Sequence, residues 1–175
     1  MKFVFGFDPS LNGTGYCVLD VSRKKPKIVE KGTVKGRNKT WGEEDTHQVR
    51  LSLISAKVRE LVAKYRPAYN QVFLERGFSN KHVNSTQAIF KARGALESEL
   101  VGFDIIEIPP NSVKKIISDY GLAHKKSVAE SVADFLEIDY AEFLDEKGNL
   151  KEDESDATAV AVVGWLKHIK PKEDK

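Results

Sequence analysis

Four acidic residues stand where their side chains could do chemistry together. Asp8 ends the apolar stretch FVFGFD, and Glu75 ends a second one, QVFLE. Asp153 and Asp156 are three residues apart in EDESDATAVAVV, so a helix there would place both on one face. Taken singly, each has an ordinary explanation, because aspartates commonly follow strands in turns and acidic residues favour helix N-termini. Their convergence on one place would require a chemical reason.

Divalent cation binding supplies such a reason. Converging carboxylates repel one another and raise one another's pKa values. Hard cations with oxygen ligands relieve the repulsion, and Mg²⁺, with Mn²⁺ as a substitute, fits such ligands best. Two ions about 4 Å apart activate a water and stabilise a leaving oxygen in phosphodiester hydrolysis. The four carboxylates therefore predict a two-metal site that cleaves a phosphodiester.

The elements that must position these carboxylates follow from hydrophobic periodicity. Strands 2–8, 71–75 and 103–108 are separated by helices and should be parallel neighbours, whereas the first three strands have short connections and should form a meander. Asp8 and Glu75 would then end adjacent strands, about 4.8 Å apart. Val160 would pack the last helix on the sheet and aim its aspartates at them. The remaining elements are strands 15–20 and 28–34 and helices from 47 to near 67, over 84–101, 111–119 and 124–137, and from about 153. We expect an α/β fold with a mixed five-stranded sheet and helices on both faces.

Composition limits the classes of protein that remain. The 175 residues suit one domain, and the net charge is only +2. Basic residues gather over 76–126 and acidic residues over 137–156, which fits a polyanion held near metal ions. The single cysteine, Cys17, excludes an intramolecular disulfide and a cysteine-rich zinc site. The chain carries no signal-peptide pattern and no apolar run of about 20 residues, so we expect an intracellular, cytoplasmic protein without a membrane segment.

Basic and aromatic residues near the carboxylates are candidates for DNA contact. Two lysine pairs bracket a short glycine-containing turn, and backbone phosphates attract such clusters, although a solvated helix face is the alternative. Phe78 follows Glu75 closely and could either stack on an unpaired base or cap the sheet core. The full candidate set for DNA contact is Arg76, Phe78, Lys81, Lys114, Lys115, Lys125 and Lys126.

Several stretches, in order, resemble the RuvC family of Holliday junction resolvases in the ribonuclease H-like superfamily. FGFDPSLNGTGY resembles the family's first strand and turn, and LERGF its second catalytic strand. FSNKHVNSTQAIFKARGAL resembles the segment leading into the dimer helix. NSVKKIISDYGLAHKKSV and DESDATAVAV resemble the basic segment and the final catalytic helix. Together the matches span most of residues 3–168.

The resemblance implies a ribonuclease H-like fold and a homodimeric, metal-dependent endonuclease that makes paired symmetric nicks in four-way DNA junctions. Asp8, Glu75, Asp153 and Asp156 would be metal ligands, with two Mg²⁺ per site. Lys125 would join them as a catalytic residue, and Lys114 would match a second family lysine near the DNA. Phe78 would match a junction-contacting aromatic residue. The acidic insert before Asp153 leaves Glu152 or Glu154 open as the third ligand, and each lysine assignment is open by one residue.

Three other functions are alternatives to a junction resolvase. A broader nuclease of branched DNA would also cut flaps and forks. A junction-binding protein without catalysis would have little reason to keep all four carboxylates. An ATPase of the actin and sugar-kinase superfamily would need two lobes, and 175 residues supply one. We expect a nuclease domain over 1–168, followed by a flexible tail over 169–175, in a protein encoded by a bacterium or by a virus in its host cell.

Overall fold

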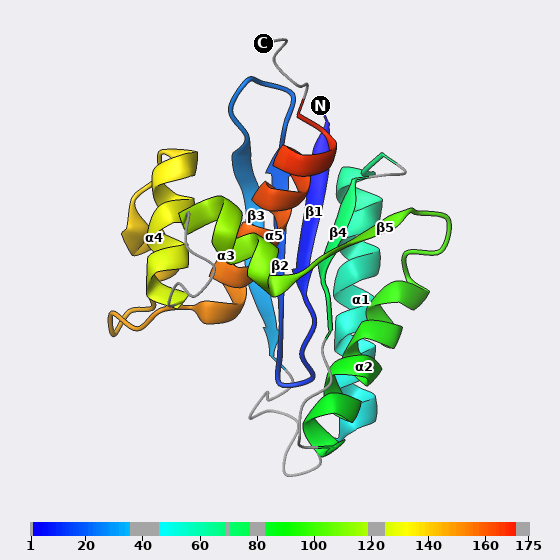
Figure 1. The fold of residues 1–175 in the computed structure, drawn as a ribbon. Coiled ribbons are helices and arrows are strands. Elements are labelled where there is room, and N and C mark those ends of the chain that lie inside the picture. The colour runs from blue at the N-terminus through cyan, green and yellow to red at the C-terminus, as the bar shows by residue number, and fades with distance from the viewer. Residues whose placement is uncertain (1, 36–45, 69–70, 78–82, 119–124, 171–175) are drawn as a thin grey trace.

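A mixed five-stranded sheet forms the centre of the molecule (Figure 1). The computed structural model describes residues 2–35, 46–68, 71–77, 83–118 and 125–170. The strands stand in the order β3-β2-β1-β4-β5. β2 is antiparallel to β1 and β3, whereas β4 is parallel to β1 and β5. The predicted meander and the predicted parallel pairs are both confirmed. The strands are β1 (Phe3–Asp8), β2 (Gly13–Asp20), β3 (Lys27–Lys35), β4 (Val72–Glu75) and β5 (Ile105–Ile108).

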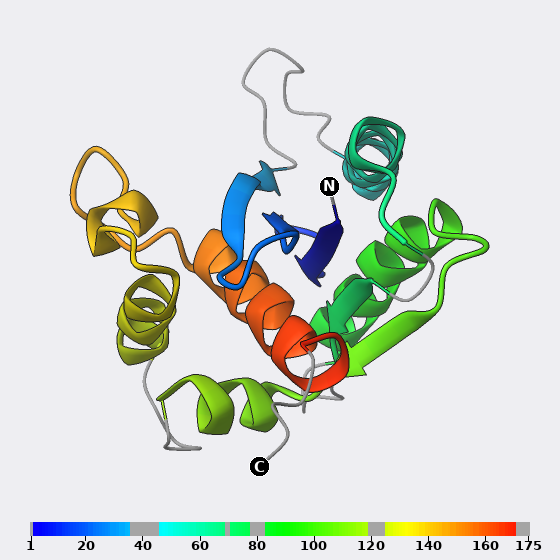
Figure 2. The same cartoon turned by 90° about the horizontal axis from the view of Figure 1, so that it is seen from above.

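Helices cover both faces of the sheet, as predicted. Along β1, Phe3, Phe5 and Phe7 point to one face, which is covered by α1 (His47–Tyr65) and α2 (Val83–Ser98). Val4 points to the other face, where α5 (Glu152–His168) lies. Figure 2 shows α1 and α2 on one side of the strands and α5 on the other. On the α5 side lie also α3 (Pro110–Ser118) and α4 (Lys125–Leu136). The sheet therefore separates two hydrophobic cores.

α5 is the central helix of the second core. From Ala157 to Trp165 every residue is buried, which explains why this stretch of the sequence is apolar all round rather than amphipathic. The helix contacts β1, β2 and β4 as well as α3 and α4. Burial on all sides fixes the direction of the helix, and therefore the place of the acidic residues in its first turn.

Glycines in the strands let α5 approach the sheet closely. A Cβ atom on Gly6 would lie 2.4 Å from the carbonyl oxygen of Ala157, and one on Gly15 would lie 2.0 Å from the carbonyl oxygen of Asp153. Both distances are far below van der Waals contact, so no side chain fits at either position without a shift of the helix backbone. The two glycines therefore determine how near the first turns of α5 come to β1 and β2.

The observed boundaries differ from the predicted ones by up to three residues. β2 begins at Gly13, two residues early, and the Thr14 hydroxyl closes the preceding turn by donating to the Ser10 carbonyl at 2.7 Å. β5 begins only at Ile105, because Phe103 is still in a turn and donates its N–H to the Leu100 carbonyl. A 3₁₀ helix, η2 (Tyr140–Phe143), lies in the acidic stretch, for which no helix was predicted. Of the described helices, none combines the length and the apolar character that crossing a membrane requires.

Candidate active site

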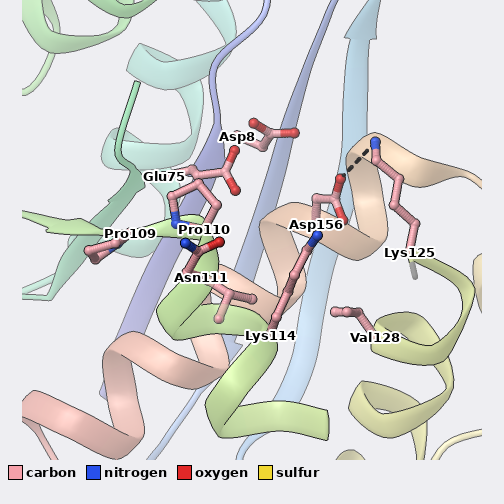
Figure 3. Close-up of a pocket in the computed structure, with 10 residues that line it drawn as sticks. Asp8, Glu75, Pro109, Pro110, Asn111, Lys114, Lys125, Val128 and Asp156 are labelled. Atoms are coloured by element: carbon pink, nitrogen blue, oxygen red, sulfur yellow. Dashed lines mark ion pairs between the residues drawn. The ribbon is translucent and has the colours of Figure 1, made fainter. Parts of the chain in front are cut away.

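Asp8 and Glu75 lie side by side at one edge of the sheet. The parallel register pairs Phe7 with Leu74, so the next residues along β1 and β4 are the two acids. Their carboxyl groups share a hydrogen bond, and Figure 3 shows them turned toward each other. Burial and the neighbouring charge of Glu75 raise the pKa of Asp8 well above its ordinary value. Burial also raises the pKa of Glu75, although the hydrogen bond from Asp8 opposes that rise. The predicted adjacency of these two side chains is therefore present in the fold.

The first turn of α5 brings Asp153 and Asp156 toward this pair. Both are partly buried, and burial is the main cause that raises the pKa of each. Their negative charges also contribute to the raised pKa of Asp8. Asp153 lies against the start of β2, where a Cβ atom on Gly13 would come within 2.5 Å of its Oδ2 atom. The four carboxylates thus form one electrostatic group drawn from three elements that are distant in the sequence.

Lys125, at the start of α4, binds the acidic turn of α5. Its Nζ atom lies 3.2 Å from a carboxylate oxygen of Asp156 and 2.7 Å from one of Glu152. Figure 3 marks the ion pair between Lys125 and Asp156. Burial of the ammonium works against its charged form, but the bond to Glu152 and the charge of Asp156 raise the pKa of Lys125 above its ordinary value. Lys125 therefore provides a positive charge in direct contact with Asp156.

The three acids considered for the third ligand occupy different surroundings. Glu154 is held by Lys31 at 3.1 Å and by Lys151 at 3.3 Å. Glu152 is exposed and bound to Lys125. Asp153, by contrast, adds its negative charge to the causes that raise the pKa of Asp8, although burial, Glu75 and Asp156 contribute more. This difference supports Asp153 as the residue that belongs with the carboxylate group.

A cavity of about 570 Å³ opens beside the carboxylates (Figure 3). It would hold roughly 19 waters at liquid density, so it is large enough for a phosphate group and its neighbours. From α3, Lys114 points into it, and the charge of Lys114 opposes the raised pKa of Asp156. Lys115 and Lys126 are exposed and do not line it. The lining residues are Asp8, Glu75, Pro109, Pro110, Asn111, Val113, Lys114, Lys125, Val128 and Asp156.

The donor set fits a hard divalent cation. Every candidate ligand is a carboxylate, and oxygen-only sets suit Mg²⁺ and Mn²⁺ rather than zinc. The raised pKa values show that these groups are desolvated and mutually repelling, which a cation would relieve. Within the described ranges, no three acidic, histidine or cysteine side chains are grouped tightly enough to enclose an ion. The closest association among the four is the Asp8–Glu75 pair.

The other residues predicted to contact DNA lie in different surroundings or outside the described residues. Arg76 is exposed and forms an ion pair with Glu107 of β5 at 2.9 Å. Lys126 lies 3.8 Å from Glu130, one turn further along α4. Phe78 and Lys81 lie outside the described residues.

The sequence analysis did not identify three residues of this region, which are Asn111, Arg93 and Glu107. Asn111 lines the main cavity, and Arg93 lines a second cavity of about 140 Å³ together with Asp8 and Glu75. Arg93 also binds Glu107. The Pro-Pro-Asn sequence after β5 was a usable signal for Asn111. Nothing local distinguishes Arg93 or Glu107, because their roles depend on which strand and helix become neighbours.

Comparisons with known proteins point to one family. The family model described as "Crossover junction endodeoxyribonuclease RuvC" matches residues 4–164. A protein of that name from Orientia tsutsugamushi (strain Ikeda) is 30% identical over 167 residues, which cover 94% of this chain and 96% of the relative. Another, from Synechococcus sp. (strain CC9311), is 31% identical over 176 residues, which cover 94% and 99%.

Solved structures share the fold. T. thermophilus RuvC in complex with Holliday junction substrate superposes with a TM-score of 0.78 at 22% identity, covering 97% of this chain and 96% of that one. A second Thermus thermophilus RuvC structure gives a TM-score of 0.74 at 23% identity, covering 94% and 95%. The predicted ribonuclease H-like fold is confirmed by this likeness.

Proposed function

The chain belongs to the RuvC family of crossover junction endodeoxyribonucleases, and we propose that it cuts four-way DNA junctions by paired, symmetric phosphodiester hydrolysis. The observation that carries this proposal is the site itself. Two strand-end carboxylates in contact face an acidic helix turn across a cavity with lysines on its wall. Carboxylates that could hold metal ions and lysines that could bind phosphate therefore lie within reach of one scissile phosphodiester.

The acidic residues would hold the metal ions. Asp8, Glu75, Asp153 and Asp156 supply the oxygen ligands. Bound Mg²⁺ or Mn²⁺ would supply a nucleophile at neutral pH and stabilise charge on the leaving oxygen. Burial raises the pKa values of both Asp8 and Glu75, which favours their protonated forms, and both must be deprotonated to act as ligands. Ion binding should therefore release protons and become tighter as pH rises.

The lysines on the cavity wall would bind and neutralise phosphate. Lys125 is partly engaged by Asp156 in the structure, and a cation on Asp156 would compete for that carboxylate. The ammonium could then turn to the non-bridging oxygens of the scissile phosphate, where charge develops during cleavage. Lys114, on the neighbouring wall, would hold the DNA backbone without reading sequence. Lys115 and Lys126, outside the cavity, would add salt-dependent affinity.

The dimer would form through α2. Val83 and Phe90 lie seven residues apart on one helical face, and their exposed fractions are 66% and 49%. A Cβ atom on Gly94, four residues further on the same face, would meet nothing within 4 Å. An exposed apolar face with a small residue permits close approach of a second copy. A two-fold dimer would present two active sites to a junction whose two cleaved strands are related by the same symmetry.

Two alternatives make different predictions for DNA cleavage. A broader nuclease of branched DNA would use the same residues and cut flaps and forks as well. A non-catalytic junction binder would keep the lysines but would not require the desolvated carboxylates of Asp8, Glu75 and Asp156 at the wall of the same cavity. Because the relatives named above are from bacteria, we propose that the protein acts in the cytoplasm, where bacterial DNA lies.

The test uses a synthetic mobile four-way junction labelled on each strand. Wild-type protein and Asp8→Asn are incubated with it in Mg²⁺ and in Mn²⁺, beside linear duplex, flap and fork controls. We expect paired symmetric nicks in the junction from the wild type alone. Equal cutting of flaps and forks would support the broader nuclease instead. Tight junction binding without cutting in either metal would contradict catalysis.

A further inference from the structure

Two arginines lie close to the carboxylates that would bind metal. Arg76 follows Glu75 directly, and Arg93 projects from α2 into the small cavity of about 140 Å³ that Asp8 and Glu75 also line. That volume holds roughly four or five waters at liquid density, so both arginines and both carboxylates border one small space. An arginine so near two carboxylates would normally form an ion pair with them. Such a pair would compete with any cation for the same oxygens.

Both guanidinium groups are instead bound to a different carboxylate. Glu107 accepts a hydrogen bond from Arg76 Nε at 2.9 Å, and its other oxygen accepts one from Arg93 Nη2. Arg93 donates a further bond to Glu97, one turn along α2. Arg93 beside Glu107 holds the pKa of that carboxyl below its ordinary value, so Glu107 is charged at neutral pH. One acidic side chain of β5 thus occupies both arginines.

The sheet places Glu107 on the opposite face from the site. In the parallel register Glu107 is the partner of Leu74, and Leu74 packs into the core under α1 and α2. Side chains alternate along a strand, so Glu75 points to the α5 face, as Phe73 does. The bonds to Glu107 therefore hold the arginines on the α2 side of the strand ends, while the metal-binding carboxylates face α5.

We propose that Glu107 is a positioning residue: it keeps both guanidinium groups on the α2 face and so leaves the carboxylates of the site available to metal ions. The inference rests on the proposed function, because it concerns the metal site described there. It assigns to β5 a role in cation affinity that is independent of any contact with DNA. It also predicts different effects for the two partners of each ion pair. Loss of Glu107 should weaken cation binding, whereas loss of an arginine should not.

The experiment measures Mn²⁺ binding to the full-length protein without DNA, by electron paramagnetic resonance of free Mn²⁺. We expect Glu107→Gln to weaken Mn²⁺ binding about 10–100-fold, the range seen when residues supporting a metal ligand are changed. Arg93→Gln should bind Mn²⁺ as the wild type does. Adding Arg76→Gln and Arg93→Gln to Glu107→Gln should restore the affinity, because the competing charges are gone. Glu99→Gln breaks a similar ion pair, with Arg59, and serves as the matched control with no expected change.

A merely structural ion pair would give a different pattern. Arg93→Gln would then weaken Mn²⁺ binding as much as Glu107→Gln does, and the triple variant would be the weakest of all. Either result, or an unchanged affinity of a folded Glu107→Gln protein, overturns the inference while the proposed function stands. If Glu107→Gln fails to fold, the Arg93→Gln measurement decides alone. Absence of Mn²⁺ binding by the wild type would overturn the proposed function and this inference with it.

Discussion

The close approach of α5 to β2 leads to a quantitative prediction for Gly15→Ala. The added methyl group would lie 2.0 Å from the carbonyl oxygen of Asp153. Ordinary van der Waals contact for a Cβ atom begins at 3.4 Å, so the first turn of α5 must move by roughly 1.4 Å. The obstacle is helix backbone rather than a flexible side chain, so the shift carries Asp153 and Asp156 with it.

We expect this displacement to affect cleavage more than stability. A misplacement of about 1 Å can cost about 10²-fold in rate, so Gly15→Ala should cut a four-way junction about 10²-fold more slowly in saturating Mg²⁺. Overpacking typically costs about 1–3 kcal/mol, and each kcal/mol lowers the melting temperature of a chain of this size by about 2–4 °C. The assays are single-turnover junction cleavage and thermal unfolding of the same preparations.

Leu19→Ala is the matched control. Leu19 is buried on the same strand and in the same core as α5, roughly 13 Å along β2 from Gly15. Its truncation should cost about 2–5 kcal/mol without pressing on Asp153. Well below both melting temperatures, it should cut at close to the wild-type rate. Cutting by Gly15→Ala within about threefold of the wild type, or equal slowing of Leu19→Ala, would refute this link between the position of α5 and cleavage.

Three further predictions concern charge, phosphate binding and assembly. Because burial and Glu75 raise the pKa of Asp8, its contribution to stability is complete below pH 3.8 and is lost as pH rises through the folded pKa. Asp8→Asn should therefore melt a few degrees higher than the wild type in EDTA at pH 7.5, with the gain vanishing near pH 3.5; an unchanged difference between these pH values would contradict this. Lys125→Ala should slow cleavage about 10²–10³-fold at saturating DNA, whereas Lys126→Ala should weaken DNA binding at low salt and leave the saturated rate unchanged. Equal rate losses in the two variants would argue against a special role for the lysine on the cavity wall. Phe90→Asp should convert a dimer to a monomer in sedimentation velocity and turn paired nicks into single ones; a monomeric wild type would remove the basis of this expectation.

The sequence predicted the parts of the site that depend on local pattern. Strand ends at Asp8 and Glu75 followed from apolar runs that stop on an acid, and their adjacency followed from the rule that helix-separated strands are parallel neighbours. Periodicity could not tell which lysine of each pair faces the cavity, and only the family resemblance pointed to Lys114 and Lys125. Lys114 and Lys125 face it while Lys115 and Lys126 do not, because helix rotation is set by packing that a single sequence does not display.

The rest of the site depends on contacts between distant residues. Glu107 and Arg93 look like ordinary surface charges in the sequence, and only the pairing of β4 with β5 beside α2 joins them. Gly6 and Gly15 are plain in the sequence, but a glycine within a strand can either weaken that strand or mark a close approach of another backbone. Only the structure decides between these alternatives, because Cβ atoms at the two positions would lie 2.0–2.4 Å from the backbone of α5.

The central position of α5 has a consequence for the synthesis of the protein. This helix supplies two of the four carboxylates and fills the core against β1, β2 and β4, yet it is encoded after every strand. A nascent chain that has not passed residue 168 therefore lacks both a complete core and the complete set of proposed metal ligands. Folding and the capacity to cut DNA would then arise together, once α5 has been translated, so that a shorter nascent chain on the ribosome has no nuclease activity.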